Sequence, residues 1–267
     1  MTESINLPGA GASFGSSPSF VELVRHELPD ALPAPRGEAP PFPVPHGTTV
    51  LGLKFTDGIV MAGDRRATVG NQIADAKMRK VFAADGYSAI AIAGVAGQAV
   101  ELVKLFQLEL EHYEKITGDR LSLEGKANRL AQMIRSNFPL AMQGLIVVPL
   151  FGGFDERRGE GRIFYYDATG GRWEEDDYQT IGSGSQPAKN SLKKRWRSGL
   201  ARDDALRVAA EALIDAADDD SATGGPDTVR GIWPVMVIVT AEGAADVPEA
   251  EVSAAVDAVL AERGAAS

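Results

Sequence analysis

Two predicted β-hairpins follow each other in the first part of this sequence, and they constrain the fold more than any other feature. In each, an Asp-Gly pair separates two short runs of apolar and β-branched residues, a strong signal for a tight turn between antiparallel strands. The turn pairs are Asp57-Gly58 and Asp85-Gly86. The strands beside them are predicted over residues 48–55, 59–62, 80–84 and 87–93. We therefore expect antiparallel pairing of neighbouring strands, not a doubly wound parallel sheet.

After the hairpins the apolar residues recur at spacings of three and four, which is typical of amphipathic helices. Helices are predicted over 99–113, 122–138 (ended by Pro139), 187–196, 203–217 and 249–261. Further strands are predicted over 145–154, 162–166, 179–181 and 235–240. Strands and helices thus alternate in blocks, which favours an α+β fold with two sheets stacked face to face and helices outside.

Residues 1–47 differ in composition from the rest of the chain. They hold nine of its fifteen prolines, and residues 9–19 are rich in glycine and serine. Such a segment disfavours helix and sheet interiors and is typical of an extended leader. Two interpretations are open: a solvated tail, or a propeptide. The composition changes abruptly at Thr48, so the folded domain is predicted over 48–267.

Rare residues limit the chemistry. The chain has no cysteine, which excludes disulfides, thiolate zinc sites and cysteine nucleophiles. Of its three histidines, His26 and His46 lie in residues 1–47. Removal of that segment would leave His112 alone, so catalysis would have to work with little or no imidazole.

Charge and hydropathy exclude two classes of partner. The formal net charge is −10, whereas non-specific affinity for nucleic acid phosphates requires clustered lysine and arginine. No apolar run approaches the roughly 18 to 20 residues that cross a bilayer, so no membrane partner is expected. The start of the chain, with Glu3, lacks the pattern of a secretory signal. Together with the missing cysteines, this favours the cytoplasm.

The two hairpins are expected to gather polar groups at one sheet edge. A turn at Asp57-Gly58 pairs residues whose numbers sum to about 115, which brings Thr48 near Asp64 and Thr68. In the second hairpin the sum is about 171, so Lys80 lies opposite position 91 and Gly94 just beyond. Each residue alone has an ordinary explanation: a β-former, a solvated charge or a basic surface.

A set of short motifs covers most of residues 47–225. They are Gly47-Thr48-Thr49 after a proline-rich leader, Gly63-Asp64-Arg65-Arg66-Ala67-Thr68, Lys80 sixteen residues after Asp64, Ile92-Ala93-Gly94, Gly182-Ser183-Gly184, and Asp220-Ser-Ala-Thr223-Gly224-Gly225. In these motifs and in their order the chain resembles the proteasome β subunits, within the N-terminal nucleophile hydrolases, and most closely their actinobacterial forms.

This resemblance implies a four-layer αββα sandwich and a threonine endopeptidase. Residues 1–47 would be a propeptide, cut autocatalytically between Gly47 and Thr48 to leave a catalytic domain over 48–267. The hydroxyl of Thr48 would be the nucleophile and its new α-amine, which titrates near 8, the general base. No histidine is then required.

The resemblance also implies roles for the other residues of the motifs. Lys80 would lower the pKa of the Thr48 hydroxyl or relay protons, and Asp64 would hold Lys80 in place. The backbone N–H of Gly94 would stabilise the oxyanion. A polar shell around the Thr48 amine would be formed by Ser183, Asp220 and Thr223. The family more often has serine where this chain has Thr223, which keeps the hydroxyl.

A substrate peptide would pair as an added strand with the backbone around Thr68 and residues 94–96. The side chain before the scissile bond would enter a pocket lined by Ala67, Met78, Phe82, Ile92, Ala96 and Val100. All six are apolar, so a preference for hydrophobic residues is expected, although each is equally interpretable as core.

Family resemblance further implies an assembly without metal or organic cofactor. Seven-membered β rings would stack between rings of α subunits (α7β7β7α7), fed with unfolded proteins by a ring ATPase. The helices over 99–113 and 122–138 are candidates for contacts between rings, or simply core elements.

Two alternatives remain at this point. The two-ring bacterial threonine peptidases of the same superfamily also begin Thr-Thr, but the segment from Thr48 onward is longer than theirs. A non-catalytic ring subunit is the second alternative. Such subunits generally lose the threonine, lysine or aspartate, whereas this chain has Thr48, Lys80 and Asp64.

Overall fold

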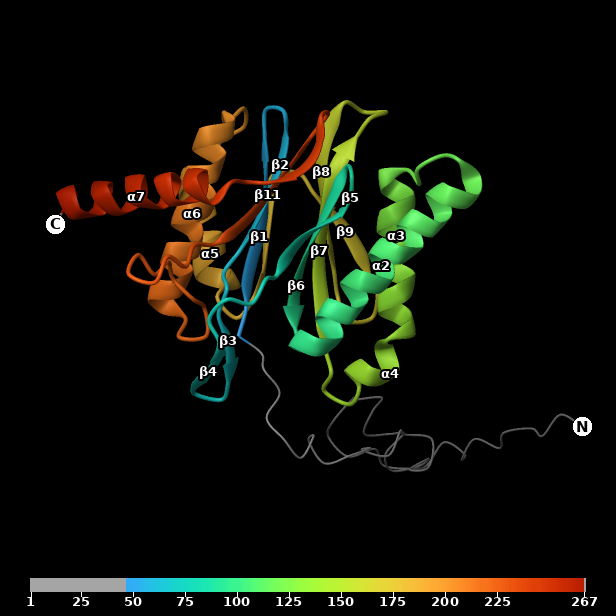
Figure 1. Ribbon diagram of the computed structural model, residues 1–267, viewed down its shortest axis with the longest axis horizontal. Helices are drawn as coiled ribbons and strands as arrows, with labels where there is room; N and C mark the ends of the chain where they lie inside the picture. The colour runs from blue at the N-terminus through green and yellow to red at the C-terminus, as the bar shows by residue number, and fades with distance from the viewer. Residues whose placement is uncertain (1–46, 267) are drawn as a thin grey trace, which may run out of the picture. The chain divides into compact units, whose positions relative to one another are not determined.

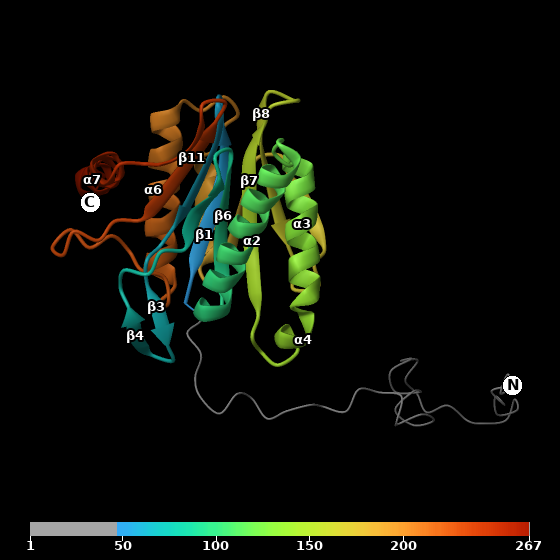
Figure 2. The ribbon, with the colours of Figure 1, turned by 45° about the vertical axis from the view of Figure 1, so that its right-hand side comes forward.

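Two five-stranded antiparallel sheets stack face to face, with helices on both outer surfaces (Figure 1). The computed structural model describes residues 47–266. One sheet has the order β10-β1-β2-β11-β12 and the other β5-β6-β7-β8-β9. A separate hairpin, β3-β4, lies below the first sheet (Figures 1 and 2). The predicted αββα sandwich is confirmed.

The strands of the first sheet are β1 (Thr49–Phe55), β2 (Gly58–Gly63), β10 (Tyr178–Gly182), β11 (Val235–Thr240) and β12 (Gly243–Asp246). Those of the second are β5 (Val81–Asp85), β6 (Ser88–Gly94), β7 (Val147–Asp155), β8 (Glu160–Tyr166) and β9 (Arg172–Glu175). The hairpin consists of β3 (Ala67–Val69) and β4 (Gln72–Asp75).

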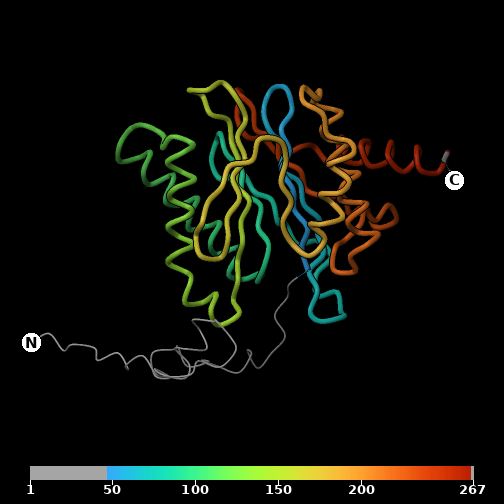
Figure 3. The backbone as a smooth tube through the Cα atoms, turned by 180° about the vertical axis from the view of Figure 1, so that it is seen from behind, coloured from blue at the N-terminus to red at the C-terminus, as the bar shows by residue number. Residues whose placement is uncertain are grey.

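Helices cover the two sheets separately, as the view from behind also shows (Figure 3). The second sheet carries α2 (Ala96–Thr117), α3 (Leu123–Ser136) and the short α4 (Phe138–Ala141). The first sheet carries α5 (Ser185–Arg195) and α6 (Arg202–Asp219), with α7 (Glu249–Ala266) packed on α6.

Alternation along the strands creates three apolar cores. In β1, Val50 faces the core between the sheets, while Leu51 faces the core under α6. In β6, Ala91 faces the space between the sheets, and Ile90 and Ile92 face α2 and α3. Successive side chains of a strand point to opposite faces, so a sheet covered on both sides must be apolar on both.

The register of the first hairpin differs from the prediction. Phe55 pairs with Gly58, so the two-residue turn is Thr56-Asp57 and not Asp57-Gly58. Gly58 belongs to the strand because β11 packs closely against it: a Cβ at Gly58 would lie 2.0 Å from Val239 O. The predicted closeness of the hairpin's two ends survives, since the Asp64 N–H donates to Thr49 O over 3.1 Å.

The turn of the second hairpin also differs from the prediction: Asp85 pairs with Ser88, so the two-residue turn is Gly86-Tyr87 and not Asp85-Gly86. A bulge between Ala83 and Asp85 offsets part of this change in register. Ala91 therefore pairs with Val81, not with Lys80, and the Ile92 N–H donates to Lys80 O over 2.9 Å.

The sequence did not indicate β3, β4, β9, β12 or α4. The helix predicted over 122–138 ends at Ser136, with Ser122 as its N-cap and Asn137 as its C-cap. Pro139 lies in the first turn of α4, where a missing N–H costs no hydrogen bond.

This fold brings four chain segments to one end of the sandwich. The start of β1, the end of β2, the residue before β5 and the end of β6 lie there, above the β3-β4 hairpin. These are the segments that carry Thr48, Asp64, Lys80 and Gly94. The expectation of a single sheet edge was wrong, because the first two come from one sheet and the last two from the other, which stacks on it.

Candidate active site

Gly47 and Thr48 lie buried directly before β1, with Thr48 only 4% exposed. The Thr48 hydroxyl donates to the carbonyl oxygen of Gly47 over 2.6 Å. A Cβ at position 47 would lie 2.5 Å from Thr68 Oγ1 and 2.6 Å from Ala222 O. Only glycine therefore fits at this junction without movement of its neighbours.

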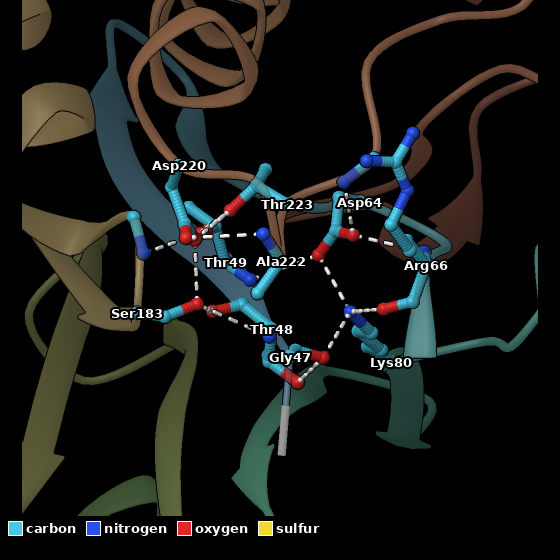
Figure 4. Close-up of polar contacts among 12 residues, drawn as sticks. Gly47, Thr48, Thr49, Asp64, Arg66, Lys80, Ser183, Asp220, Ala222 and Thr223 are labelled. Atoms are coloured by element: carbon cyan, nitrogen blue, oxygen red, sulfur yellow. Dashed lines mark hydrogen bonds and ion pairs between the residues drawn. The ribbon is translucent and has the colours of Figure 1, made fainter. Parts of the chain in front are cut away.

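Lys80 is buried and makes three polar contacts. Its Nζ lies 2.7 Å from Asp64 Oδ1, 3.0 Å from Gly47 O and 2.5 Å from Arg66 O (Figure 4). Three acceptors match the three hydrogens of an ammonium group, which favours the charged form. Burial nevertheless lowers the pKa of Lys80 below its usual 10.5, and the charge of Asp64 only partly offsets this effect.

Asp64 holds Lys80 through a carboxylate that backbone donors fix. Oδ1 also accepts the Thr49 N–H over 2.8 Å, and Oδ2 accepts the N–H groups of Arg66 (2.8 Å) and Gly224 (2.9 Å). Both Asp64 and Lys80 are 1% exposed. The carboxylate can therefore neither rotate nor escape to solvent, and it fixes Lys80 beside Thr48.

A second polar group approaches Thr48 from the opposite side. Ser183 Oγ lies 3.2 Å from Thr48 O and 3.5 Å from Thr48 N, and it donates to Asp220 Oδ2 over 2.6 Å. Thr223 Oγ1 donates to the same carboxylate oxygen over 2.6 Å. Burial raises the pKa of Asp220, but these two bonds, the Ala222 N–H and the charge of Lys80 together lower it overall.

Gly94 ends β6 in a conformation that requires glycine. Its φ is +115°, and a Cβ there would lie 2.1 Å from Ile146 O. The Ile92 N–H donates to Lys80 O, and the Val95 N–H donates to Ile146 O on the other side. Because alternate N–H groups of a strand point the same way, the Gly94 N–H is directed to the side of Lys80.

Thr49 was missed in the sequence analysis as a site residue. It is fully buried, its hydroxyl lies 2.6 Å from Thr223 Oγ1, and it accepts the Gly184 N–H over 3.0 Å. The signal that could have found it is its position, directly after Thr48 in a strand whose alternate residues face opposite layers.

A family model described as "Proteasome subunit" matches residues 44–231. The chain belongs to the proteasome subunit family. It is 57% identical to the proteasome subunit beta of Streptomyces griseus subsp. griseus over 240 residues, 89% of this chain and 85% of the relative. It is 51% identical to the proteasome subunit beta of Frankia casuarinae over 259 residues, 96% of this chain and 94% of the relative.

The expected resemblance to actinobacterial proteasome β subunits is thereby confirmed, and so is function as a β subunit of the 20S proteasome in protein degradation. The structure brings together Thr48, Asp64 and Lys80 on one side and Ser183, Asp220 and Thr223 on the other (Figure 4). Their catalytic roles stay predictions.

The residues predicted to line a substrate pocket are of two kinds. Ile92 belongs to the core under α2 and α3, and Ala67 is 4% exposed. The others are partly exposed, as the residues of a pocket wall must be: Thr68, Met78, Phe82, Ala96 and Val100. Their part in substrate binding stays a prediction.

Within residues 47–266, no group of three or more His, Cys, Asp or Glu side chains is placed to hold a metal ion. In the same part of the chain, none of the helices combines the length and the apolar character that crossing a membrane requires.

Proposed function

We propose that the chain is a catalytic β subunit, a threonine endopeptidase that uses Thr48. The observation that carries this proposal is the convergence of the buried Lys80–Asp64 pair and the Thr48 hydroxyl on a single atom, the carbonyl oxygen of Gly47. In an acyl-transfer site a nucleophile is activated by a neighbouring group that takes its proton or lowers its pKa, and a third group orients that neighbour. All three meet here with hardly any exposure to solvent.

The first reaction is the cut between Gly47 and Thr48. Thr48 Oγ1 attacks the carbonyl carbon of Gly47, and the C–N bond breaks as the hydroxyl proton passes to the Thr48 nitrogen. Water then hydrolyses the ester, leaving a carboxylate on Gly47 and a free amine on Thr48. Departure of the leader, residues 1–47, also frees the Lys80 hydrogen that Gly47 O accepts, next to the Thr48 hydroxyl. The leader up to residue 46 lies outside the described residues.

The mature site repeats this chemistry on peptides. The Thr48 amine takes the hydroxyl proton, Oγ1 attacks the substrate carbonyl, and the Gly94 N–H stabilises the oxyanion. The amine passes its proton to the departing peptide nitrogen, then activates the water that hydrolyses the acyl ester. The Lys80 charge stabilises the alkoxide, while Ser183, Asp220 and Thr223 orient the amine.

Substrates are unfolded polypeptides, cleaved after hydrophobic residues that enter an apolar pocket beside Met78 and Val100. In the assembly, β rings stack between rings of α subunits, and a ring ATPase delivers substrate in the cytoplasm. The intact Thr48, Asp64 and Lys80 set argues against a non-catalytic ring subunit. The matched relatives are named as proteasome subunits, which disfavours the two-ring peptidase.

The test uses the Thr48→Ala variant assembled with α subunits. We expect the wild-type chain to begin at Thr48 by mass spectrometry and to hydrolyse a fluorogenic peptide. The variant should keep its leader and should not hydrolyse the peptide. Thr240→Val, at the far end of β11, is the control for loss of a threonine hydroxyl. Hydrolysis by Thr48→Ala would refute the nucleophile, and six-fold rings without α subunits in electron micrographs would favour the two-ring peptidase.

A further inference from the structure

Thr49 lies between the two polar groups of the site and bonds to both. Its backbone N–H donates to Asp64 Oδ1 over 2.8 Å, on the Lys80 side. Its hydroxyl lies 2.6 Å from Thr223 Oγ1, on the Asp220 side. The residue is fully buried, so solvent does not compete for these bonds. Figure 4 shows Thr49 beside Thr48, with Thr223 on one side and Asp64 further on.

The direction of the hydrogen bonds follows from which groups can donate. The Gly184 N–H can only donate, so Thr49 Oγ1 accepts it over 3.0 Å. The hydroxyl hydrogen of Thr223 goes to Asp220 Oδ2, since a carboxylate only accepts. The remaining hydrogen between the two threonines therefore belongs to Thr49, which donates to Thr223.

The result is a one-way chain of donors that ends on a charge: Gly184 N–H, Thr49 hydroxyl, Thr223 hydroxyl, Asp220 carboxylate. Each bond in such a chain polarises the next and strengthens it. The same Asp220 oxygen accepts the hydroxyl of Ser183, whose Oγ faces the Thr48 nitrogen. Without the Thr49 hydroxyl, the Asp220 oxygen that accepts the Ser183 hydroxyl would be held less firmly.

The close approach of these groups requires glycine at position 184. A Cβ at Gly184 would lie 2.5 Å from Thr49 Oγ1 and 2.6 Å from Thr223 Oγ1. The site therefore has a glycine where the two hydroxyls and an N–H must come within hydrogen-bond distance.

We propose that Thr49 is a positioning residue that couples the two halves of the site, with its N–H fixing Asp64 and Lys80 and its hydroxyl fixing Thr223 and Asp220. The nucleophile and its own amine belong to one residue, Thr48. The Lys80 side and the Asp220 side of the site must therefore both be placed correctly for that residue to react. This inference rests on the proposed function of Thr48. Thr49 contacts the groups around the nucleophile, and the expected substrate strand runs past Thr68 and residues 94–96, so its loss lowers kcat and leaves KM nearly unchanged.

The test compares Thr49→Val with Thr49→Ser in the assembled full chain. Valine keeps the shape, the buried methyl group and the N–H to Asp64 but has a second methyl group in place of the hydroxyl. Serine keeps the hydroxyl and loses a buried methyl group. We expect Thr49→Val to lower kcat per processed subunit about tenfold, the equivalent of one lost hydrogen bond in the transition state, with KM within about twofold. Thr49→Ser should keep kcat within about twofold while its unfolding midpoint in urea falls.

Thr49→Ser, which loses stability but keeps its kcat, separates positioning from a structural role. A kcat that follows the urea midpoint in both variants, a KM that rises with kcat unchanged, or a Thr49→Val chain that fails to assemble would overturn the inference. A folded, assembled Thr49→Val chain that keeps its leader, beside a processed Thr49→Ser chain, would support it, because the leader is cut by the same nucleophile.

Two further variants complete the design. Thr180→Val removes another buried threonine hydroxyl, which donates to Ser185 O over 2.8 Å, and should leave kcat unchanged. Thr48→Ala separates the two claims. Activity retained by Thr48→Ala would remove the proposed function itself, whereas activity lost by Thr48→Ala but kept by Thr49→Val would overturn only the inference on Thr49.

Discussion

At the scale of single residues, the site depends on a buried ion pair that neither partner can leave. Lys80 and Asp64 are held by backbone groups from three separate segments: Arg66, Thr49 and Gly224. Burying one charge without the other is far more costly than burying the pair. The pair therefore bears on both the proposed chemistry and the stability of the fold, and a matched variant is needed to separate the two.

Lys80→Met should lower kcat for peptide hydrolysis by about 10²-fold or more, because no positive charge then stabilises the Thr48 alkoxide. It should also cost about 3–5 kcal/mol of stability, since Asp64 stays buried without its partner. Lys126→Met is the control: Lys126 pairs with Asp85 at 2.5 Å and is likewise buried. It should lose comparable stability in urea unfolding and keep its kcat. Equal kcat for the two variants would contradict the role of Lys80.

The second residue-scale prediction concerns pH. The pKa of Asp220 is lowered from its usual 3.8, so its ionised form stabilises the folded chain above about pH 4, and this contribution is lost as the pH falls through the lowered pKa. Ser183→Ala removes one of the bonds that lower it. We expect the acid unfolding midpoint, followed by circular dichroism, to move to higher pH. Ser253→Ala, on α7, should leave the midpoint unchanged, and an unmoved midpoint in Ser183→Ala would contradict the prediction.

At the scale of elements, the sequence predicted the helices and strands with periodic apolar residues and missed the strands that depend on a neighbouring strand. Both hairpins, α2 and α6 follow from their apolar spacing. The strands β4, β9 and β12 do not, because Gln72–Asp75 is exposed throughout and Arg172–Glu175 and Gly243–Asp246 are polar or small edge segments. Their strand conformation comes from the neighbour they pair with, which spacing along the chain cannot show.

The same distinction applies to the site. The closeness of Thr48 and Asp64 could be predicted, because hairpin pairing brings strand ends together even when the register is shifted. Lys80 lies before a strand of the other sheet, so its place beside them depends on how the two sheets stack. Asp220 and Thr223 directly follow α6, more than 150 residues from Thr49, so only the motif resemblance pointed to them. The contact of Thr49 with Thr223 could not be predicted without the packing of α6 on β1.

A buried arginine fixes α3 to the second sheet. Arg162 is 3% exposed and bonds to Asp155, Glu174 and Glu124, the last from the first turn of α3. Arg162→Met should cost about 3–5 kcal/mol in urea unfolding, because three carboxylates lose their common partner. Arg129→Met, which breaks an exposed pair with Glu109, should cost less than about 1 kcal/mol. Similar losses of unfolding free energy in the two variants would show that the Arg162 contacts contribute no more to stability than an exposed ion pair.

At the scale of the whole molecule, assembly is the remaining requirement. The outer surface of α2 exposes large apolar side chains where a free surface helix would have polar ones. Leu105 is 48%, Leu108 61% and Ile116 70% exposed. Exposed apolar residues gathered along one helix are typical of protein–protein contacts, which agrees with the predicted role of this helix between rings.

Leu108→Lys should therefore impair ring formation and leave the isolated chain folded. A lysine buried in an apolar interface is costly, whereas on an exposed position of a helix it is tolerated. Native mass spectrometry with α subunits would show fewer complete particles, and circular dichroism melting of the free chain would stay unchanged. Lys104→Leu, a change of opposite sense at another exposed position of α2, should not impair assembly. Full assembly of Leu108→Lys would exclude this surface.

Under the proposed function, the leader is the first substrate that each site meets, because the oxygen of Gly47 is bound by Lys80 and by the Thr48 hydroxyl. That cut would occur once in the life of a chain. The mass of each subunit would then show whether its own site had ever worked. The number of chains in a particle that still carry a leader would equal the number of sites that have never worked, so the active fraction could be counted without any peptide substrate.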